Sequence, residues 1–292
     1  MAALDEFAEI TKRNEPLAPY TYLRVGGPAD YLIEPRSRDE LAAVVRRCSQ
    51  ENIPLHVIGG ACNVLVRDEG VRGVLLRLTH PAFTELHVEG KTVKAGAGAA
   101  VSALISRAAE AGLAGLEILI GIPGTVGGAL RCNAGDRSGD IGQFVRRVEV
   151  LDVGGQVQIR ERDELQFTYH WSNLDDPVLL TAEFQLEQDA ADLIVKRMRK
   201  AWIMRKAGQP LNYQAAGRIF KNPRGLSASA LIEQAGLGKT RVGGAEVSER
   251  DAGFIVVHPG GTARDVLRLI DLVRSRVQER FGVELELEIR VW

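Results

Sequence analysis

This chain has almost no net charge. Its 292 residues include 37 lysines and arginines and 38 aspartates and glutamates, which gives a formal net charge of −1 at neutral pH. Proteins that hold nucleic acid or an anionic membrane surface by electrostatic attraction carry a basic excess or a basic patch. The balance therefore predicts no nucleic-acid partner and no membrane partner.

Cysteine is scarce as well. Cys48, Cys62 and Cys132 lie far apart, and none of them has the Cys-x-x-Cys or Cys/His spacing of a metal site. The pattern predicts neither a bound metal nor a disulfide framework. It fits a protein of the reducing cytoplasm.

Long apolar runs are also missing. No stretch is long enough to span a bilayer, and the opening segment MAALDEFAEITKRNE has early acidic residues where a secretion signal has an apolar core. What is present is a hydrophobic fraction of 45% and a charged fraction of 26%, as in ordinary globular proteins. A chain of this length buries a large core, and we expect two or three subdomains.

The segment Glu117–Gly135, EILIGIPGTVGGALRCNAG, stands out by its glycines. Glycine allows the backbone to approach a ligand closely, and consecutive main-chain N–H groups form a concave nest that holds a phosphate. The apolar residues between the glycines are too many for a solvated linker. Two interpretations stay open from residue type alone: a buried loop around a ligand, or a tight pair of turns in a core.

A second segment of this kind is His56–Val66, HVIGGACNVLV. An apolar strand runs into Gly59 and Gly60, followed by a small polar residue and an amide. Such a turn is typical of a cradle for a phosphate or a ring. Two cradles in one chain predict a long ligand that contains a diphosphate.

Three segments together resemble a known family. They are TYLRVGGPADYLIEP (Thr21–Pro35), IGGACNVLVRDEGVRGVLLRL (Ile58–Leu78) and GLEILIGIPGTVGGALRCNAG (Gly115–Gly135). In order and spacing they are similar to the FAD-binding blocks of the UDP-N-acetylenolpyruvoylglucosamine reductase (MurB) family, in its shorter subtype. The resemblance implies an α+β protein with a vanillyl-alcohol-oxidase-like (PCMH-type) FAD-binding fold of two α/β subdomains, plus a C-terminal α/β substrate-binding domain.

The resemblance also implies which residues bind FAD. Cys62 departs from the family, which usually has serine there, although either residue is small enough for the loop. The expected FAD-binding residues are Val57, Ile58, Gly59, Gly60, Ala61, Cys62, Asn63, Val64, Gly121, Ile122, Pro123, Gly124, Gly127, Gly128, Ala129, Asn133 and Gly135.

The family's reaction, by the same resemblance, is reduction of UDP-N-acetylglucosamine enolpyruvate to UDP-N-acetylmuramate for peptidoglycan precursor synthesis. NADPH reduces FAD, and the flavin passes a hydride to the vinyl carbon of this UDP-linked amino sugar. The neighbouring carbon then needs stabilisation of its negative charge and a proton. The family supplies these with an arginine, a serine and a glutamate.

Only the glutamate is retained here, as Glu288. His170 stands in Tyr-His-Trp-Ser where the family has arginine, and Arg218 stands in Gly-Arg-Ile-Phe where the family has the proton-donating serine. Arginine does not release a proton near neutral pH. We therefore expect a catalytic set of Glu288, Arg218 and His170, in which Arg218 supplies the cation lost at residue 170 and the proton comes from His170, Glu288 or water. Tyr169, Lys221 and Asn222 keep the pattern of substrate-binding residues.

Further departures lie in the C-terminal part. Asp251 stands where we expect histidine or asparagine, and Gly253 and Val257 stand where we expect asparagines. Ser229-Ala230 replaces a small and basic pair. Alternatives therefore stay open: a working reductase, an FAD protein for another substrate, or a silent flavin- or nucleotide-binding homologue. Arg218 would then be a salt-bridged surface residue, His170 part of an aromatic cluster, and Glu288 one of three acids on a solvated strand.

Two phosphate-binding motifs are only apparent. Gly96-Ala97-Gly98 begins like a dinucleotide motif, but Val101 occupies the third glycine position, so we interpret it as a turn. Gly238-Lys239-Thr240 resembles the end of a P-loop, but the first glycine would fall at Glu233 and a helix precedes it.

Patterning predicts the organisation of the chain. We expect FAD-binding subdomains at 1–79 and 80–189 and a substrate-binding domain with a C-terminal strand at 190–292. Ser37 and Glu40 predict a capping box, and Thr262 predicts the cap of a long helix. Gly154-Gly155 predicts a hairpin turn. The alternation in VELELEIRVW predicts a half-exposed strand at the C-terminus. The sequence carries no signal for the oligomeric state.

Overall fold

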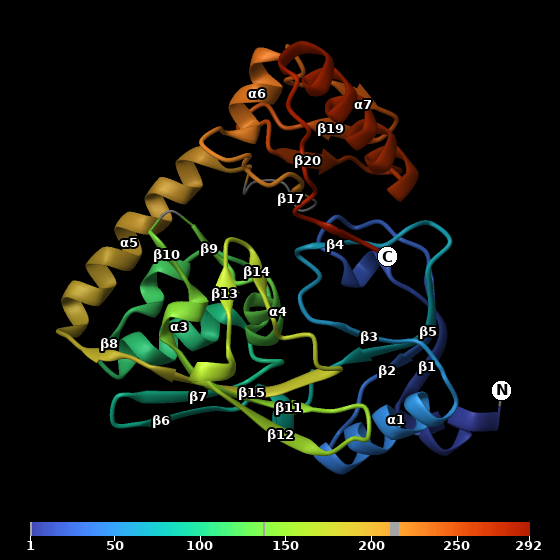
Figure 1. Ribbon diagram of the computed structural model, residues 1–292, viewed down its shortest axis with the longest axis vertical. Helices are drawn as coiled ribbons and strands as arrows, with labels where there is room; N and C mark the ends of the chain where they lie inside the picture. Colours follow the sequence, from blue (N-terminus) through green and yellow to red (C-terminus); the bar gives the residue numbers. More distant parts are fainter. Residues whose placement is uncertain (1, 137, 211–215) are drawn as a thin grey trace. The chain divides into compact units, whose positions relative to one another are not determined.

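The computed structural model describes residues 2–136, 138–210 and 216–292 (Figure 1). Contacts between residues group the chain into two compact units, and each unit is discontinuous in sequence. Unit 1 comprises Met1–Asn14, Asp30–Gly60 and Arg72–Met204, and unit 2 comprises Glu15–Ala29, Ala61–Val71 and Arg205–Trp292. This partition differs from the predicted division at residues 79 and 189, which stays a prediction.

The first sheet of unit 1 has the strand order β1-β2-β5-β3, and β3 and β5 run parallel. Helix α1 packs its buried face, Leu41, Val44, Val45 and Cys48, into the core of this layer. The bounds of these elements, with the short helices that flank them, are η1 (Ala2–Ile10), β1 (Thr11–Pro16), β2 (Pro28–Ile33), α1 (Arg38–Gln50), β3 (Leu55–Ile58), β5 (Val71–Arg77) and α2 (Pro81–Thr84).

The start of α1 confirms part of the predicted capping box. Ser37 Oγ accepts a hydrogen bond from Glu40 N at 3.1 Å, as an N-cap serine does. Glu40 Oε2 accepts from Arg36 N at 2.7 Å, one residue before the cap. The N–H of Glu40 therefore bonds to the N-cap serine, and the carboxylate of Glu40 bonds to the residue before the cap.

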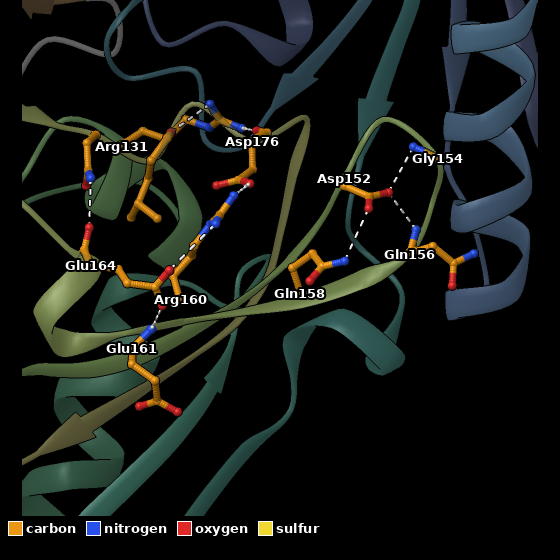
Figure 2. A network of polar contacts seen from close by, with 11 residues as sticks. Arg131, Asp152, Gly154, Gln156, Gln158, Arg160, Glu161, Glu164 and Asp176 are labelled. Atoms are coloured by element: carbon orange, nitrogen blue, oxygen red, sulfur yellow. Dashed lines mark hydrogen bonds and ion pairs between the residues drawn. The ribbon is translucent and has the colours of Figure 1, made fainter.

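The second sheet of unit 1 has five strands in the order β12-β11-β15-β7-β6, and each adjacent pair is antiparallel. Strands β11 and β12 are joined by the predicted turn at Gly154-Gly155. Asp152 Oδ1 accepts hydrogen bonds from Gly154 N and Gln156 N, both at 2.9 Å, and so stabilises this turn (Figure 2). The strands are β6 (Leu86–Glu89), β7 (Thr92–Gly96), β11 (Val145–Leu151), β12 (Val157–Glu161) and β15 (Val178–Gln185).

The glycine-rich segment folds beside this sheet in unit 1. It contains η3 and the short helix α4, whose N-cap Thr125 accepts from Gly128 N at 3.4 Å. Val126, Ala129 and Leu130 lie in the same core as β7 and β15. The other elements here are α3 (Val101–Glu110), β8 (Leu113–Ala114), η3 (Leu116–Leu119), α4 (Val126–Arg131), β9 (Gly135–Asp136), β10 (Gly139–Asp140), η4 (Ile141–Phe144), η5 (Arg162–Glu164), β13 (Phe167–Thr168), β14 (Trp171–Ser172) and β16 (Glu187–Gln188).

Unit 2 is built on the four-stranded antiparallel sheet β17-β20-β19-β18. The buried face of α7 packs on it, and the predicted Thr262 cap is confirmed as a capping box with Asp265. Helix α5 (Ala191–Gly208) joins the two units in sequence. The remaining elements are η2 (Ala18–Tyr20), β4 (Val64–Leu65), β17 (Ala216–Arg218), α6 (Ala228–Gln234), β18 (Arg241–Val242), β19 (Ala245–Val247), β20 (Phe254–Val257), α7 (Ala263–Phe281) and β21 (Arg290–Val291).

The C-terminal tail differs from the predicted continuous strand. Only Arg290–Val291 forms a strand, β21, which runs parallel to β4, and Leu287 forms an isolated bridge with Phe220. The predicted alternation persists in burial, because Leu285 and Ile289 are buried. The tail bonds to two separate backbone segments, and this interrupts the regular ladder.

Across the described ranges no helix is long and apolar enough to cross a membrane. The same residues contain no group of three or more His, Cys, Asp or Glu side chains placed to hold a metal ion.

Candidate functional site

Unit 1 contains a cavity of about 240 Å³ that both glycine-rich segments line. One wall comes from the end of β3 and the Gly59-Gly60 turn, and another comes from the start of α4. The lining residues are Val57, Ile58, Gly59, Gly60, Arg77, Leu78, Thr79, Ala97, Gly98, Thr125, Gly127, Gly128, Arg131 and Leu179. A cavity of this size accepts part of a dinucleotide-sized ligand.

Two of these glycines are required because chain segments cross closely. A methyl group on Gly59 would lie 2.2 Å from Thr125 Oγ1, and one on Gly98 would lie 1.9 Å from the main-chain oxygen of Leu78. Any larger residue would force the segments apart. At these two positions glycine is required by the packing of the protein itself, so it gives no information about the ligand.

Gly128 is different. A methyl group there would meet only Thr125 Oγ1, at 3.4 Å, which is an ordinary van der Waals contact. Its φ is not in the left-handed region, and the residue is exposed on the cavity wall. The described protein around Gly128 thus has room for alanine. Glycine here leaves space for a ligand backbone or phosphate to approach, so this wall of the cavity fits FAD.

Arg131 brings a positive charge to the cavity wall. Its guanidinium donates to the main-chain oxygens of Leu174 at 3.0 Å, Asp176, and Pro177 at 3.2 Å. The carboxylate of Asp176 accepts from Arg160 at 2.7 Å, so it is directed to a different arginine (Figure 2). Main-chain oxygens therefore fix the orientation of Arg131, which suits a group that faces an anionic ligand.

Other residues predicted to bind FAD do not line this cavity. Gly121, Ile122, Pro123, Gly124, Ala129, Asn133 and Gly135 lie elsewhere in unit 1, and Ala61, Cys62, Asn63 and Val64 belong to unit 2. Their contact with a cofactor stays a prediction. Asn133 makes two internal hydrogen bonds, because its Nδ2 donates to Thr168 O at 2.8 Å and its Oδ1 accepts from Gly142 N at 3.0 Å.

Asn133 thereby supports the hairpin that carries His170. Strands β13 and β14 pair Thr168 with Trp171, and Tyr169 and His170 form the turn between them. His170 has φ of 51°, a left-handed conformation that is costly for a residue with a side chain. Its ring meets the Tyr169 ring edge-on, with centroids 4.2 Å apart.

The second group of candidate residues lies in unit 2, around Glu288. The three acids of the tail are not equivalent: the side chains of Glu284 and Glu286 are 77% and 76% exposed, whereas the Glu288 carboxyl is largely buried. Burial raises the pKa of Glu288 to about 7, and the positive charges of Arg218 and Lys221 oppose this rise. The alternative of a solvated strand face does not hold for Glu288.

Two backbone segments fix Glu288 in place. Its N–H donates to Ile219 O at 2.8 Å, and its main-chain oxygen accepts from Asn63 Nδ2 at 3.1 Å. On either side, Lys221 N donates to Glu286 O at 2.9 Å and Arg290 N donates to Asn63 O at 3.0 Å. The acid is thus attached to the segment that carries Arg218 and to the segment that follows the Gly59-Gly60 turn in sequence.

Arg218 is paired within unit 2. Its Nη2 donates to Asp251 Oδ2 at 2.8 Å, and its Cζ lies 4.8 Å from the centroid of the Phe254 ring. The side chains of Arg218 and Asp251 are 27% and 14% exposed. Arg218 is salt-bridged, as one alternative had it, and the pair is partly buried beside Glu288.

Lys221 and Asn222 lie next to this cluster in sequence. Lys221 Nζ is 3.5 Å from Glu286 Oε2, and Asn222 Oδ1 accepts from Ala228 N at the start of α6. The structure thus gathers Glu288, Arg218 and Lys221 in unit 2, while Tyr169 and His170 belong to unit 1. Sequence reasoning missed the pairing role of Asp251 and eight cavity-lining residues, which are Arg77, Leu78, Thr79, Ala97, Gly98, Thr125, Arg131 and Leu179. Two signals point to some of these residues: Thr125 and Arg131 lie in the glycine-rich segment Glu117–Gly135, and Ala97 and Gly98 lie in the Gly-Ala-Gly turn.

The glycine-lined cavity of unit 1 fits an FAD-binding protein, and comparison with known proteins confirms this class. Residues 29–159 match the FAD binding domain family, and residues 209–292 match the UDP-N-acetylenolpyruvoylglucosamine reductase C-terminal domain family.

Relatives of similar length define the family. The chain is 44% identical to UDP-N-acetylenolpyruvoylglucosamine reductase 2 of Symbiobacterium thermophilum and 43% identical to the reductase of Moorella thermoacetica, in both cases over 96% of this chain and 92% of the relative. The crystal structure of MurB from Thermus caldophilus matches with a TM-score of 0.83 at 38% identity, over 97% of this chain and 98% of that one. The chain belongs to the UDP-N-acetylenolpyruvoylglucosamine reductase family, and the predicted α+β FAD-binding fold is confirmed.

Proposed function

We propose that this protein is the FAD-dependent enzyme that reduces UDP-N-acetylglucosamine enolpyruvate to UDP-N-acetylmuramate, with NADPH as reductant, for peptidoglycan precursor synthesis in the cytoplasm. The observation that carries the proposal is the buried carboxyl of Glu288, held under the influence of Arg218 and Lys221 in the unit that includes the C-terminal domain match. The cavity in unit 1 supports FAD as the cofactor.

The residues of the cavity fit the cofactor in three ways. Gly128 leaves room for close approach, Arg131 offers a fixed cation, and the apolar side chains of Val57, Ile58 and Leu179 exclude water. The chemistry that FAD would supply, when held by these residues, is the transfer of a hydride from NADPH to the terminal vinyl carbon of the substrate.

The residues of unit 2 serve the other half of the reaction. The substrate carbon that bears the carboxylate gains negative charge and needs a proton. Arg218 offers N–H donors to stabilise that charge, and Glu288 has a pKa near 7, where a carboxyl group is an effective acid. Lys221 and Asn222 are proposed to bind the nucleotide part. Tyr169 is proposed as a further substrate-binding residue and His170 as a further catalytic residue.

The test is anaerobic reduction and reoxidation of the flavin. The purified protein should bind FAD, lose its visible absorbance with NADPH faster than with NADH, and recover it on addition of UDP-N-acetylglucosamine enolpyruvate. UDP-N-acetylglucosamine, which lacks the vinyl group, is the matched control and should leave the flavin reduced.

The second candidate is a divergent FAD protein that acts on another substrate or has lost catalysis. The substitutions His170, Arg218, Asp251 and Val257 favour it. A flavin that NADPH reduces but this substrate leaves reduced would support the second candidate.

A further inference from the structure

The guanidinium of Arg218 is held by two contacts, a hydrogen bond to Asp251 and a cation–π contact with Phe254. Asp251 Oδ2 accepts from its Nη2 at 2.8 Å, while Asp251 Oδ1 accepts from Gly253 N at 2.9 Å. The carboxylate is therefore fixed by its own turn before it contacts the guanidinium. The ring of Phe254 lies 4.8 Å from Cζ and adds a cation–π contact.

Gly253 leaves the space that this pair occupies. A methyl group on Gly253 would lie 3.1 Å from Asp251 Oδ1 and 3.3 Å from Arg218 Nη1, closer than side chains normally approach. Ser229 Cβ lies 3.8 Å from the same point. Positions 218, 251 and 253 all depart from the residues that the family resemblance led us to expect, and they meet at one place beside Ser229. These substitutions therefore lie in one group of contacting residues and are not spread over the protein.

The anchored guanidinium retains donors for a ligand. Arginine carries five N–H donors in a planar fork, and among the described side chains only Asp251 accepts a hydrogen bond from Arg218. A carboxylate is the anion that this fork matches best, through two parallel hydrogen bonds. The substrate proposed above carries one carboxylate on its enolpyruvyl group.

The proton must come from another group, because arginine does not release one. Glu288 is the acid that the same cluster contains. The charged groups that act on its carboxyl from the neighbouring segment are Arg218 and Lys221, and these are paired in turn with Asp251 and Glu286. The main-chain bonds to Ile219 and Asn63 fix its position.

We propose that Asp251 is a positioning residue that holds Arg218 for the substrate carboxylate, and that Glu288 delivers the proton in place of the absent hydroxyl. The inference rests on the proposed function. In the balanced step, the terminal vinyl carbon receives the hydride, the electron pair of the double bond moves to the carbon that bears the carboxylate, and this carbon takes the proton of Glu288. The glutamate then regains a proton from solvent, and NADPH supplies the two electrons of each turnover.

The first test measures single-turnover reoxidation across pH, with the flavin photoreduced so that NADPH plays no part. Wild type should reoxidise fast at low pH and lose rate as the pH rises through about 7, because Glu288 is then deprotonated. Glu288→Gln should be at least about 100-fold slower. Glu284→Gln, an exposed acid of the same tail, should match wild type.

Asp251 and Arg218 should move this pH profile in opposite directions. Asp251→Asn removes the charge that offsets Arg218, which lowers the pKa of Glu288 and shifts the loss of rate to lower pH. Arg218→Met removes the cation without restoring the serine hydroxyl of the family, and shifts the loss of rate to higher pH. Asp251→Asn should also slow reoxidation roughly 10- to 100-fold, as misplacement of a substrate-binding group does. Gly253→Ala, whose methyl group crowds the Arg218–Asp251 pair, should also slow reoxidation, and Gly238→Ala, which has open space around it, should not.

A second test needs no cofactor or substrate. In a double-mutant cycle on the apoprotein, Arg218→Ser and Asp251→Asn should each lower the urea midpoint, and the double variant should lower it by less than their sum. Additive effects would overturn the positioning role of Asp251. Wild-type rates in Glu288→Gln, or pH profiles that do not move in the other variants, would overturn the proton transfer. If the substrate never reoxidises the flavin of the wild-type protein, the proposed function itself is contradicted. The double-mutant cycle would still show whether Asp251 and Arg218 interact.

Discussion

Asn63 donates a hydrogen bond from its side-chain amide to the main-chain oxygen of Glu288 at 3.1 Å, although the two residues are 225 positions apart. The main-chain oxygen of Asn63 accepts from Arg290 N at 3.0 Å, so the asparagine holds the tail on both sides of Ile289. A residue of the second glycine-rich segment is thus a structural partner of the candidate acid. This contact links the loop sequence to the position of Glu288.

Asn63→Asp should damage this link more than Asn63→Ala. Aspartate places an acceptor against the Glu288 oxygen, whereas alanine only removes a donor. We expect Asn63→Ala to lower the free energy of unfolding by about 1 kcal/mol and Asn63→Asp by more. Urea unfolding of the apoprotein measures both, and equal stability of Asn63→Asp and wild type would contradict the role given to this amide.

Glu288 should make stability depend on pH in an unusual direction. Its pKa is about 7 in the folded protein against an ordinary value of 4.5, so the folded state holds its proton longer than the unfolded state does. The stabilisation is complete below pH 4.5 and declines as the pH rises to about 7, by about 3 kcal/mol, since one pH unit corresponds to about 1.4 kcal/mol.

Comparison with Glu288→Gln isolates this effect, because glutamine does not titrate. Between pH 4.5 and pH 7 the wild type should lose unfolding free energy relative to Glu288→Gln, so the variant gains stability by comparison. The matched control Glu284→Gln, with a side chain 77% exposed, should show no such trend. A flat difference for Glu288→Gln would mean that the carboxyl is not buried as described.

Gly128→Ala should separate cofactor binding from folding. The protein around residue 128 has room for the methyl group, and alanine is the better helix former at this position in α4. We expect unchanged or slightly higher stability of the apoprotein, with weaker FAD binding. Gly127→Ala, whose methyl group would lie 3.0 Å from Ala97 Cβ, should destabilise the apoprotein itself. Isothermal titration with FAD and urea unfolding distinguish them, and full FAD affinity in Gly128→Ala would exclude close approach of the cofactor there.

Asn133→Gly should loosen the hairpin that carries His170. Glycine accepts the left-handed conformation of residue 133, at φ of 43°, so the variant removes only the two side-chain hydrogen bonds. The buried N–H of Gly142 then loses its acceptor, at a cost of about 1–3 kcal/mol. Urea unfolding measures the loss, and limited proteolysis near residues 168–171 reports the hairpin. Wild-type behaviour in both would show that the amide does not support this turn.

Much of the fold could be predicted because it depends on local patterns. Ser37 and Thr262 cap the helices that follow them, and the Gly154-Gly155 turn joins β11 and β12. Four of the glycines singled out in the two loops, Gly59, Gly60, Gly127 and Gly128, line the cavity. Each of these features is encoded within a few residues, so one sequence is enough to detect it.

The rest depends on partners that are remote in sequence. Arg218 and Asp251 are 33 positions apart, and nothing in either segment indicates the pair. Glu284, Glu286 and Glu288 share one alternating pattern, yet only Glu288 has a largely buried carboxyl, and its main chain is bonded to the segments around Asn63 and Ile219. The same bonds interrupt the expected tail strand. Alternation reports which side a residue faces but not what packs on that side.

The most direct test of the account is turnover in heavy water with analysis of the product by mass spectrometry. The protein, FAD, NADPH and UDP-N-acetylglucosamine enolpyruvate are incubated in D2O, and the product is returned to H2O before measurement. We predict UDP-N-acetylmuramate that retains deuterium on the carbon that bears the carboxylate, and at least about 100-fold less product from Glu288→Gln. Oxidation of NADPH without formation of this product would contradict the account.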